Sequence, residues 1–175
     1  MWNKQTKFTA LVNAFSADLH RYAYWLCRDK DLAEDLVQET YARAWRAIDS
    51  LRDQSAAKQW LITTLRREHA RLYERRRHEF AEVELENIEA LRPAYDTSVE
   101  AHVLRQSLHK LPEEYLEPLI LQVLWGYNCD EIAGLLNLSK SAVMTRLFRA
   151  RQKLRGLLEQ EAEDEQQTDK TKPMV

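Results

Sequence analysis

The chain has 175 residues, a formal net charge of −2 and 31% charged residues, a length that suits one medium domain or two small ones. Its 3 glycines lie far apart, and no stretch of about 18 apolar residues occurs, which excludes a glycine-rich phosphate loop and a membrane-spanning helix. The N-terminal residues lack the apolar run of a signal peptide, so we expect a cytoplasmic protein.

Two helices are predicted first along the chain. Apolar residues recur at helical spacing over residues 8–26 and again over residues 32–48. Asp31 and Glu34 resemble a capping box, so we expect the second helix to begin there. Together with a third helix, these elements predict a helical domain over residues 5–77.

The third helix of this domain is predicted over residues 59–77, after a polar connection at residues 49–58. Arg67, Arg71 and Arg75 follow at intervals of four, so they share one face of the helix. Arginines beside aromatic rings suit single-stranded nucleic acid, because rings stack on bases and guanidinium groups bind phosphates. The residues that make up this surface are Trp60, Thr63, Thr64, Arg67, Arg71, Tyr73, Arg75 and Arg76. The alternative is that Trp60 is a core anchor and that the arginines are merely solvated.

Two acidic segments flank the remaining part of the chain. Residues 78–99 carry 1 Lys or Arg against 6 Asp and Glu, and residues 159–175 carry 2 against 6. We interpret residues 78–96 as a mostly extended acidic linker and residues 159–175 as a disordered acidic tail. The overall prediction is an all-α chain of two small helical domains joined by this linker.

The second domain is predicted over residues 97–158 and contains a helix-turn-helix at residues 130–151. Asn128 and Glu131 form a capping signal before a short apolar helix. Asn137 tolerates the left-handed conformation of a tight turn, and a longer basic helix follows.

The second helix of this motif has two distinct faces. Val143, Leu147 and Ala150 recur at core spacing, with Leu154 one turn later. The residues that should point outward are Ser141, Met144, Thr145, Phe148, Arg149 and Gln152, with Arg146 near the edge. In a major groove, arginine pairs with guanine, and Phe or Thr contacts a thymine methyl group. The alternative is a helical hairpin in an ordinary bundle, with Phe148 packed inside.

Several motifs occur in the order and spacing of one protein family. They lie at residues 35–45 (DLVQETYARAW), 60–67 (WLITTLRR), 111–115 (LPEEY) and 130–133 (DEIA), and at 141–151 (SAVMTRLFRAR). The chain thus resembles a bacterial extracytoplasmic-function (ECF) sigma factor of RNA polymerase. The resemblance implies a non-enzymatic subunit without cofactor or metal, which directs core RNA polymerase to promoters through −10 and −35 elements and assists their melting.

The resemblance also implies a role for particular residues. The helix that would bind the β′ clamp helices of core polymerase carries Asp35, Leu36, Gln38, Glu39 and Trp45. The arginine-rich surface would engage the −10 element, and the outer face of the helix-turn-helix would read the −35 element. Further implied partners are the polymerase β subunit and an anti-sigma factor.

The chain departs from the family pattern at two functional positions. Glu68 and His69 stand where the family usually has Arg-Asn, and Met144 stands where it usually has Lys or Arg. These departures imply a different capture of the −10 base and a different −35 contact.

Two other functions share part of the pattern. An ordinary helix-turn-helix repressor or activator would need residues 130–151 but neither Asp35–Trp45 nor the arginine-rich helix. An interaction protein could retain the fold and only sequester an anti-sigma factor. Cys27 and Cys129 suit reduced thiols, and the five histidines show no zinc-ligand spacing with them.

Overall fold

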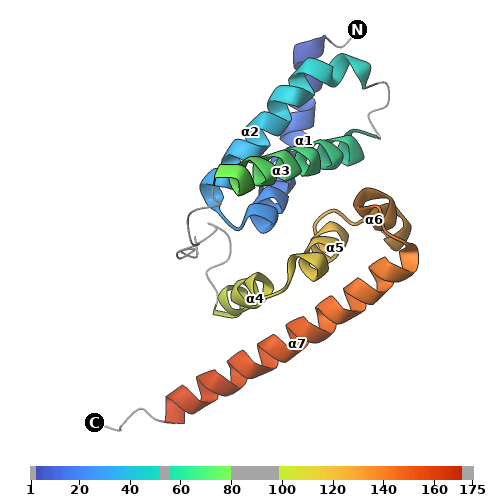
Figure 1. Ribbon diagram of the computed structural model, residues 1–175. Coiled ribbons are helices and arrows are strands. Elements are labelled where there is room, and N and C mark those ends of the chain that lie inside the picture. Colours follow the sequence, from blue (N-terminus) through green and yellow to red (C-terminus); the bar gives the residue numbers. More distant parts are fainter. Residues whose placement is uncertain (1–2, 52–55, 80–98, 171–175) are drawn as a thin grey trace. The chain divides into compact units, whose positions relative to one another are not determined.

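The computed structural model describes residues 3–51, 56–79 and 99–170, which form helices and no strand (Figure 1). The chain divides into two compact units, residues 1–91 and residues 92–175. This confirms the all-α prediction. The expected linker at residues 78–96 lies outside the described residues, except for its first two, which end a helix. No described helix combines the length and the apolar character that crossing a membrane requires.

The first unit is built from three long helices and one short turn of 3₁₀ helix. These are α1 (Lys4–Cys27), α2 (Lys30–Ala47), η1 (Ile48–Ser50) and α3 (Ala57–Glu79). α1 and α2 lie side by side, and α3 packs across both of them (Figure 1). Their shared core includes the fully buried side chains of Leu19, Tyr22, Val37, Leu61, Ile62 and Leu65. These are apolar positions of the predicted helical stripes, which explains why the three helices pack on one another.

The start of α2 differs from the prediction by two residues. Asp29, and not Asp31, is the N-cap, and its Oδ1 accepts a hydrogen bond of 2.9 Å from the backbone N–H of Leu32. Arg28 at the preceding corner has a left-handed φ of 55°. The chain therefore turns before Asp29, and Asp31 lies in the first turn of the helix. There its negative charge interacts favourably with the positive end of the helix dipole.

The second unit has four helices, of which the last is the longest. They are α4 (Val99–His109), α5 (Glu113–Val123), α6 (Cys129–Leu136) and α7 (Lys140–Lys170). α7 packs against α4, α5 and α6. The core residues at these contacts include Leu116, Leu121, Trp125, Ile132, Val143, Leu147 and Ala150. The core of the second unit is thus formed between α7 and the other three helices.

The predicted turn chemistry around α6 is confirmed. The Asn128 side chain accepts from the N–H groups of Asp130 and Glu131, and Glu131 Oε2 accepts from the N–H of Asn128 at 2.8 Å. Asn137 ends the helix with a left-handed φ of 54°. This conformation brings α7 back across α6 after a short turn.

The end of α7 corrects the expected disordered tail. The helix continues through residues 159–170, which the sequence analysis assigned to that tail. This stretch contains neither Gly nor Pro and is rich in Glu and Gln, so it can extend a helix that has already been nucleated. Lys110 Nζ lies 2.6 Å from Glu161 Oε1, an ion pair that ties this extension to the end of α4.

Candidate nucleic-acid interface

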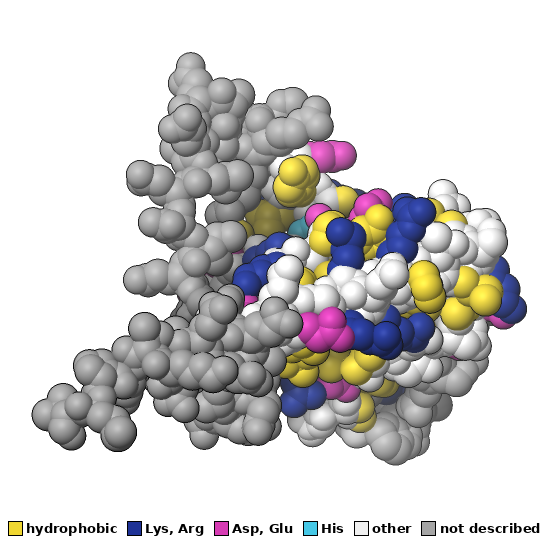
Figure 2. Space-filling model, turned by 90° about the horizontal axis from the view of Figure 1, so that it is seen from below, with side chains coloured by type: hydrophobic (Ala, Val, Ile, Leu, Met, Phe, Trp, Pro, Cys, Tyr) yellow, Lys and Arg dark blue, Asp and Glu magenta, His cyan; other side chains and the backbone are white. Residues whose placement is uncertain are grey.

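The outer face of α7 exposes large apolar side chains beside arginine. Met144 is 56% exposed and Phe148 is 66% exposed, whereas Val143, Leu147 and Ala150 are buried. Ser141, Thr145 and Arg149 are also exposed, and Arg146 is half-buried. The alternative with Phe148 packed inside is therefore wrong. Figure 2 shows one face of the molecule on which basic and hydrophobic side chains lie among each other.

Three polar contacts hold the first turns of α7 in place. The N–H of Ala142 donates to Ser139 Oγ at 3.2 Å, so Ser139 caps the start of this helix. Lys140 Nζ lies 2.8 Å from Asp130 Oδ2, and this hydrogen bond raises the pKa of the lysine. The Thr145 hydroxyl donates to the carbonyl of Ser141 at 2.9 Å, so its oxygen remains available as an acceptor.

A shallow groove runs along one side of this outer face. Its walls come from the start of α5 and the start of α7, and it is lined by Glu114, Tyr115, Ser141, Ala142, Thr145, Arg146 and Arg149. Of the residues predicted to read duplex DNA, the structure gathers four here, while Met144 and Phe148 are exposed outside this lining. The arrangement offers guanidinium donors, hydroxyl groups and apolar surface on one helix, a set that base edges can recognise.

The basic face of α3 carries the second predicted nucleic-acid surface. Arg67, Arg71 and Arg75 are exposed on it, and Tyr73 is 65% exposed. Trp60 is half-buried. The Arg76 side chain lies outside the described part of the chain. Tyr73 is two residues from Arg71 and from Arg75, so its ring points away from the arginine face. Trp60 precedes Arg67 by seven residues, so it is the ring on the arginine side that could stack on an unstacked base.

The two threonines of this helix use their hydroxyl protons on the backbone. Thr63 Oγ1 donates to the carbonyl of Gln59, and Thr64 Oγ1 donates to the carbonyl of Trp60, both at 2.8 Å. Each hydroxyl keeps lone pairs with which it can still accept a hydrogen bond. Toward nucleic acid, these side chains are therefore better placed to accept from base amino groups than to donate to phosphates.

A buried acid beneath the basic face was missed by the sequence analysis. Glu68 is only 6% exposed, and its Oε1 lies 2.6 Å from Arg43 Nε on α2 and 2.8 Å from Arg71 Nη1 on α3. Arg43 Nε is also 3.1 Å from Glu39 Oε1. The signal available in the sequence was an acid within a run of arginines; the pairing with α2 could only come from the packing.

The outer surface of α2 carries four of the five residues predicted to bind polymerase. Asp35, Gln38 and Glu39 are exposed, but Leu36 is 3% exposed and packs in the core. As a surface contact, the Leu36 prediction is corrected, because this side chain is almost fully buried. Trp45 is 37% exposed and lies edge-on to the Phe8 ring, with a centroid separation of 5.2 Å.

The α2 surface and the α3 surface meet in one groove. Asp35 and Glu39 stand on the α2 side, and Arg71 and Arg75 stand on the α3 side. The remaining lining residues are Leu36, Gln38, Ala42, Glu68 and Leu72. The groove therefore has an acidic wall, a basic wall and a partly apolar floor, and it brings two separately predicted surfaces next to each other.

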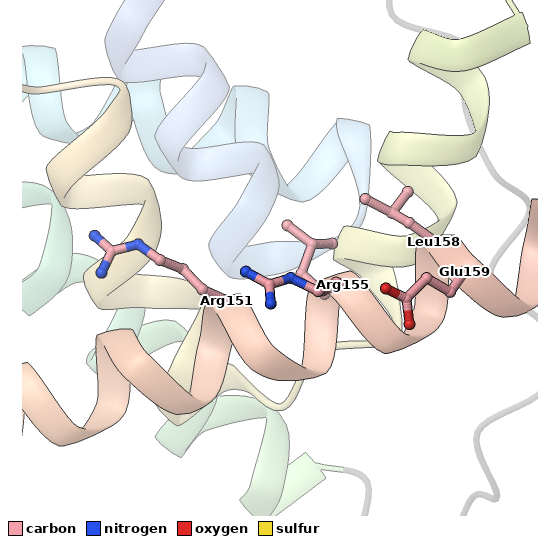
Figure 3. Close-up of a pocket in the computed structure, with 5 residues that line it drawn as sticks. Arg151, Arg155, Leu158 and Glu159 are labelled. Carbon is pink, nitrogen blue, oxygen red and sulfur yellow. The ribbon is translucent and has the colours of Figure 1, made fainter.

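A shallow apolar depression on α7 offers no comparable site. It is lined by Arg151, Leu154, Arg155, Leu158 and Glu159, all from the same helix. Figure 3 shows the labelled side chains following one another along α7. A depression formed by one helix cannot enclose a ligand. Among the residues that the structure describes, no three His, Cys, Asp or Glu side chains gather to hold a metal ion.

Comparisons with known proteins agree with this division into two units. The family model of Sigma-70 region 2 matches residues 11–79, and that of Sigma-70, region 4 matches residues 101–154. The chain is 34% identical to the ECF RNA polymerase sigma factor EcfG of Rhodopseudomonas palustris, over 80% of this chain and 78% of that protein. It is 33% identical to SigM of Bacillus subtilis, an ECF RNA polymerase sigma factor, over 89% and 97%.

Two solved structures are similar over most of the chain. The sigma factor RpoE of Bartonella quintana, in complex with the anti-sigma factor NepR, is 29% identical with a TM-score of 0.74, over 87% of this chain and 96% of that one. CnrH, in complex with the cytosolic domain of CnrY, is 28% identical with a TM-score of 0.61, over 90% of each chain.

Proposed function

The chain belongs to the extracytoplasmic-function (ECF) sigma factors of RNA polymerase, and from that premise we propose how its two units share promoter recognition. Members of this family are transcription initiation factors rather than enzymes. The two units match regions 2 and 4 of the family in that order. We therefore assign the −10 element to the first unit and the −35 element to the second.

The outer face of α7 reads the −35 element as duplex DNA. One observation carries this assignment: Phe148 is exposed beside Arg149, while the opposite face of the same helix is buried. An exposed phenyl group has an unfavourable hydration free energy that contact with a thymine methyl removes. Arg149 donates to guanine, and Met144 supplies an apolar contact where the family usually has a cation. The other reading residues are Ser141, Thr145, Arg146 and Phe148.

The exposed face of α3 engages the −10 element after the strands part. Arg67, Arg71 and Arg75 bind phosphates of the single strand, and Arg76 is assigned to the same set. Trp60 offers a ring for stacking, and Thr63 and Thr64 accept from base amino groups. Capture of an extruded base offsets an unstacking cost of a few kcal/mol, which is how binding assists melting without ATP.

The acidic face of α2 binds the β′ clamp helices of core polymerase. Asp35, Gln38 and Glu39 are exposed and suit a basic partner helix. Trp45 adds a partly exposed ring at the end of the same helix. Leu36 supports this surface from below instead of contacting the partner, because it is buried. The polymerase β subunit is the partner proposed for the second unit.

An anti-sigma factor is proposed as the regulator of this chain. The support is that RpoE and CnrH, which share its fold, were solved with the anti-sigma factor NepR and with the cytosolic domain of CnrY. Such a partner would control initiation by covering the surfaces that bind polymerase.

Run-off transcription tests the proposal as a whole. Purified core polymerase is combined with this protein and a library of genomic promoter fragments. We expect new start sites that core polymerase alone does not use, together with weak promoter binding by the free protein, because its net charge is near zero. Identical start sites with and without the protein would refute the proposed function.

A further inference from the structure

Four charged side chains form a continuous chain of contacts between α2 and α3. Arg43 Nε lies between Glu39 Oε1, at 3.1 Å, and Glu68 Oε1, at 2.6 Å. The same Glu68 oxygen lies 2.8 Å from Arg71 Nη1. Two acids and two bases thus alternate, and the cluster has no net charge.

The members of this cluster differ in how freely they can exchange partners. The Glu68 side chain is 6% exposed, and its Oε1 lies 2.6 Å from Nε of Arg43 on the neighbouring helix, whose side chain is 38% exposed. The Arg71 side chain is 51% exposed. An ion pair to a half-exposed arginine is weak enough for a phosphate to replace it, whereas removing both cations from a buried carboxylate is costly. Arg71 is therefore the member that can leave.

We propose that Glu68 is a positioning residue that withholds Arg71 from the DNA backbone. Its carboxylate occupies one guanidinium donor and cancels the charge of Arg71, so that this arginine adds little to phosphate binding in the free protein. The inference rests on the proposed function, in which α3 is the single-strand surface. The proposed role explains why Glu68 stands in a run of arginines: it limits the affinity of α3 for DNA.

The proposal predicts that two arginines of α3 contribute differently to the affinity for single-stranded DNA. Arg71 and Arg75 are one turn apart and both exposed, but of these two arginines only Arg71 forms an ion pair with Glu68 among the described residues. If Glu68 withholds Arg71, then Arg71→Gln changes single-strand affinity by much less than Arg75→Gln does. This comparison leaves the buried residue unchanged and so does not depend on whether a Glu68 variant folds.

The closing experiment measures binding of the full chain to a fluorescein-labelled 20-nucleotide single-stranded DNA of mixed sequence. Fluorescence anisotropy gives the affinity at several salt concentrations. Glu68→Gln is expected to raise affinity about five- to tenfold near 50 mM salt and to steepen the salt dependence by about 0.7, the values for one further phosphate contact. A purely structural role of Glu68 would not produce a steeper slope.

Two controls separate the mechanism from general electrostatics. Glu74→Gln removes the same charge from an exposed position of α3. We expect less than a twofold gain and an unchanged slope, because a solvated carboxylate that forms none of the ion pairs of the described residues withholds no arginine from phosphate. In the Glu68→Gln background, Arg71→Gln should abolish the gain, whereas Arg75→Gln should reduce affinity equally in both backgrounds.

The possible results distinguish a failure of the Glu68 restraint from a failure of the assignment of α3 to single-stranded DNA. If Arg71→Gln costs the wild type as much as Arg75→Gln, or if the Glu68→Gln gain survives Arg71→Gln, the restraint by Glu68 is refuted. The same holds if folded Glu68→Gln, checked by circular dichroism, shows no gain while Arg75→Gln still weakens binding. If Arg75→Gln has no effect in either background, the assignment of α3 to single-stranded DNA fails as well.

Discussion

Leu147 and Phe148 are consecutive residues of α7 with opposite environments: the first is 2% exposed and the second is 66% exposed. Replacing each by alanine therefore separates folding from recognition. Leu147→Ala should lower the free energy of unfolding of its unit by about 2–5 kcal/mol, because it leaves a cavity. Phe148→Ala should change it by less than about 0.5 kcal/mol.

In DNA binding, Phe148 is the residue of this pair that should matter directly. Phe148→Ala should weaken promoter binding by the polymerase complex by roughly 1 kcal/mol, in the range of one lost base contact. Urea unfolding and binding to duplex promoter DNA measure the two effects. If Phe148→Ala unfolds the unit and leaves binding unchanged, Phe148 is a packing residue after all.

Arg149→Ala should weaken −35 recognition by roughly 1–3 kcal/mol if the guanidinium bonds a guanine with two hydrogen bonds. The loss should be confined to one base pair, because base contacts specify sequence and phosphate contacts do not. Competition binding against a set of single-base promoter variants measures this. Arg155→Ala is the matched control, since it removes an equally exposed cation from α7 outside the proposed reading face. An unchanged preference at every −35 position would exclude Arg149 from base reading.

Asp35→Ala combined with Gln38→Ala should weaken binding to core polymerase by more than about 1 kcal/mol, the usual threshold for an energetically important interface residue. Both side chains are exposed, so the fold should be retained. Surface-immobilised core polymerase gives the affinity directly. Glu34→Ala, at an exposed acid of the same helix, is the control. Undiminished binding of the double variant would exclude these two side chains from the polymerase interface.

Asn128→Ala should destabilise the second unit by about 1 kcal/mol, because Asn128 satisfies two backbone N–H groups at the start of α6. Glu131→Gln should cost less, since an amide can still accept from the N–H of Asn128. Urea unfolding monitored by helix content measures both changes. Equal stability of Asn128→Ala and the wild type would show that the cap adds nothing to the fold.

Tyr127 links stability to alkaline pH. Burial, and secondarily the charge of Glu131, raises the pKa of this phenol from 10.0 to about 12. The folded state therefore keeps the proton while the unfolded state loses it, and stability falls as the pH rises from about 10 to about 12. The loss amounts to roughly 2–3 kcal/mol for a shift of this size. Relative to the wild type, Tyr127→Phe should show a flatter decline over this range in urea unfolding. Parallel pH profiles would rule out this coupling.

Local patterns in the sequence were sufficient to predict the helices and the helix-turn-helix. Helical periodicity separates Leu147 from Phe148, and the capping box of Asn128 and Glu131 needs only residues three apart. The order of the motifs also identified the family. These predictions succeed because their causes lie within one or two helical turns.

Tertiary packing decided what no local pattern contains. It placed Glu68 between Arg43 and Arg71, and it tied the end of α4 to Glu161, where a disordered tail is predicted from the sequence. Periodicity shows which residues share a face of a helix, but the partner of that face comes from another helix. The charge of a residue such as Glu68 acquires its role only when packing removes it from water and supplies a cation from a different part of the chain.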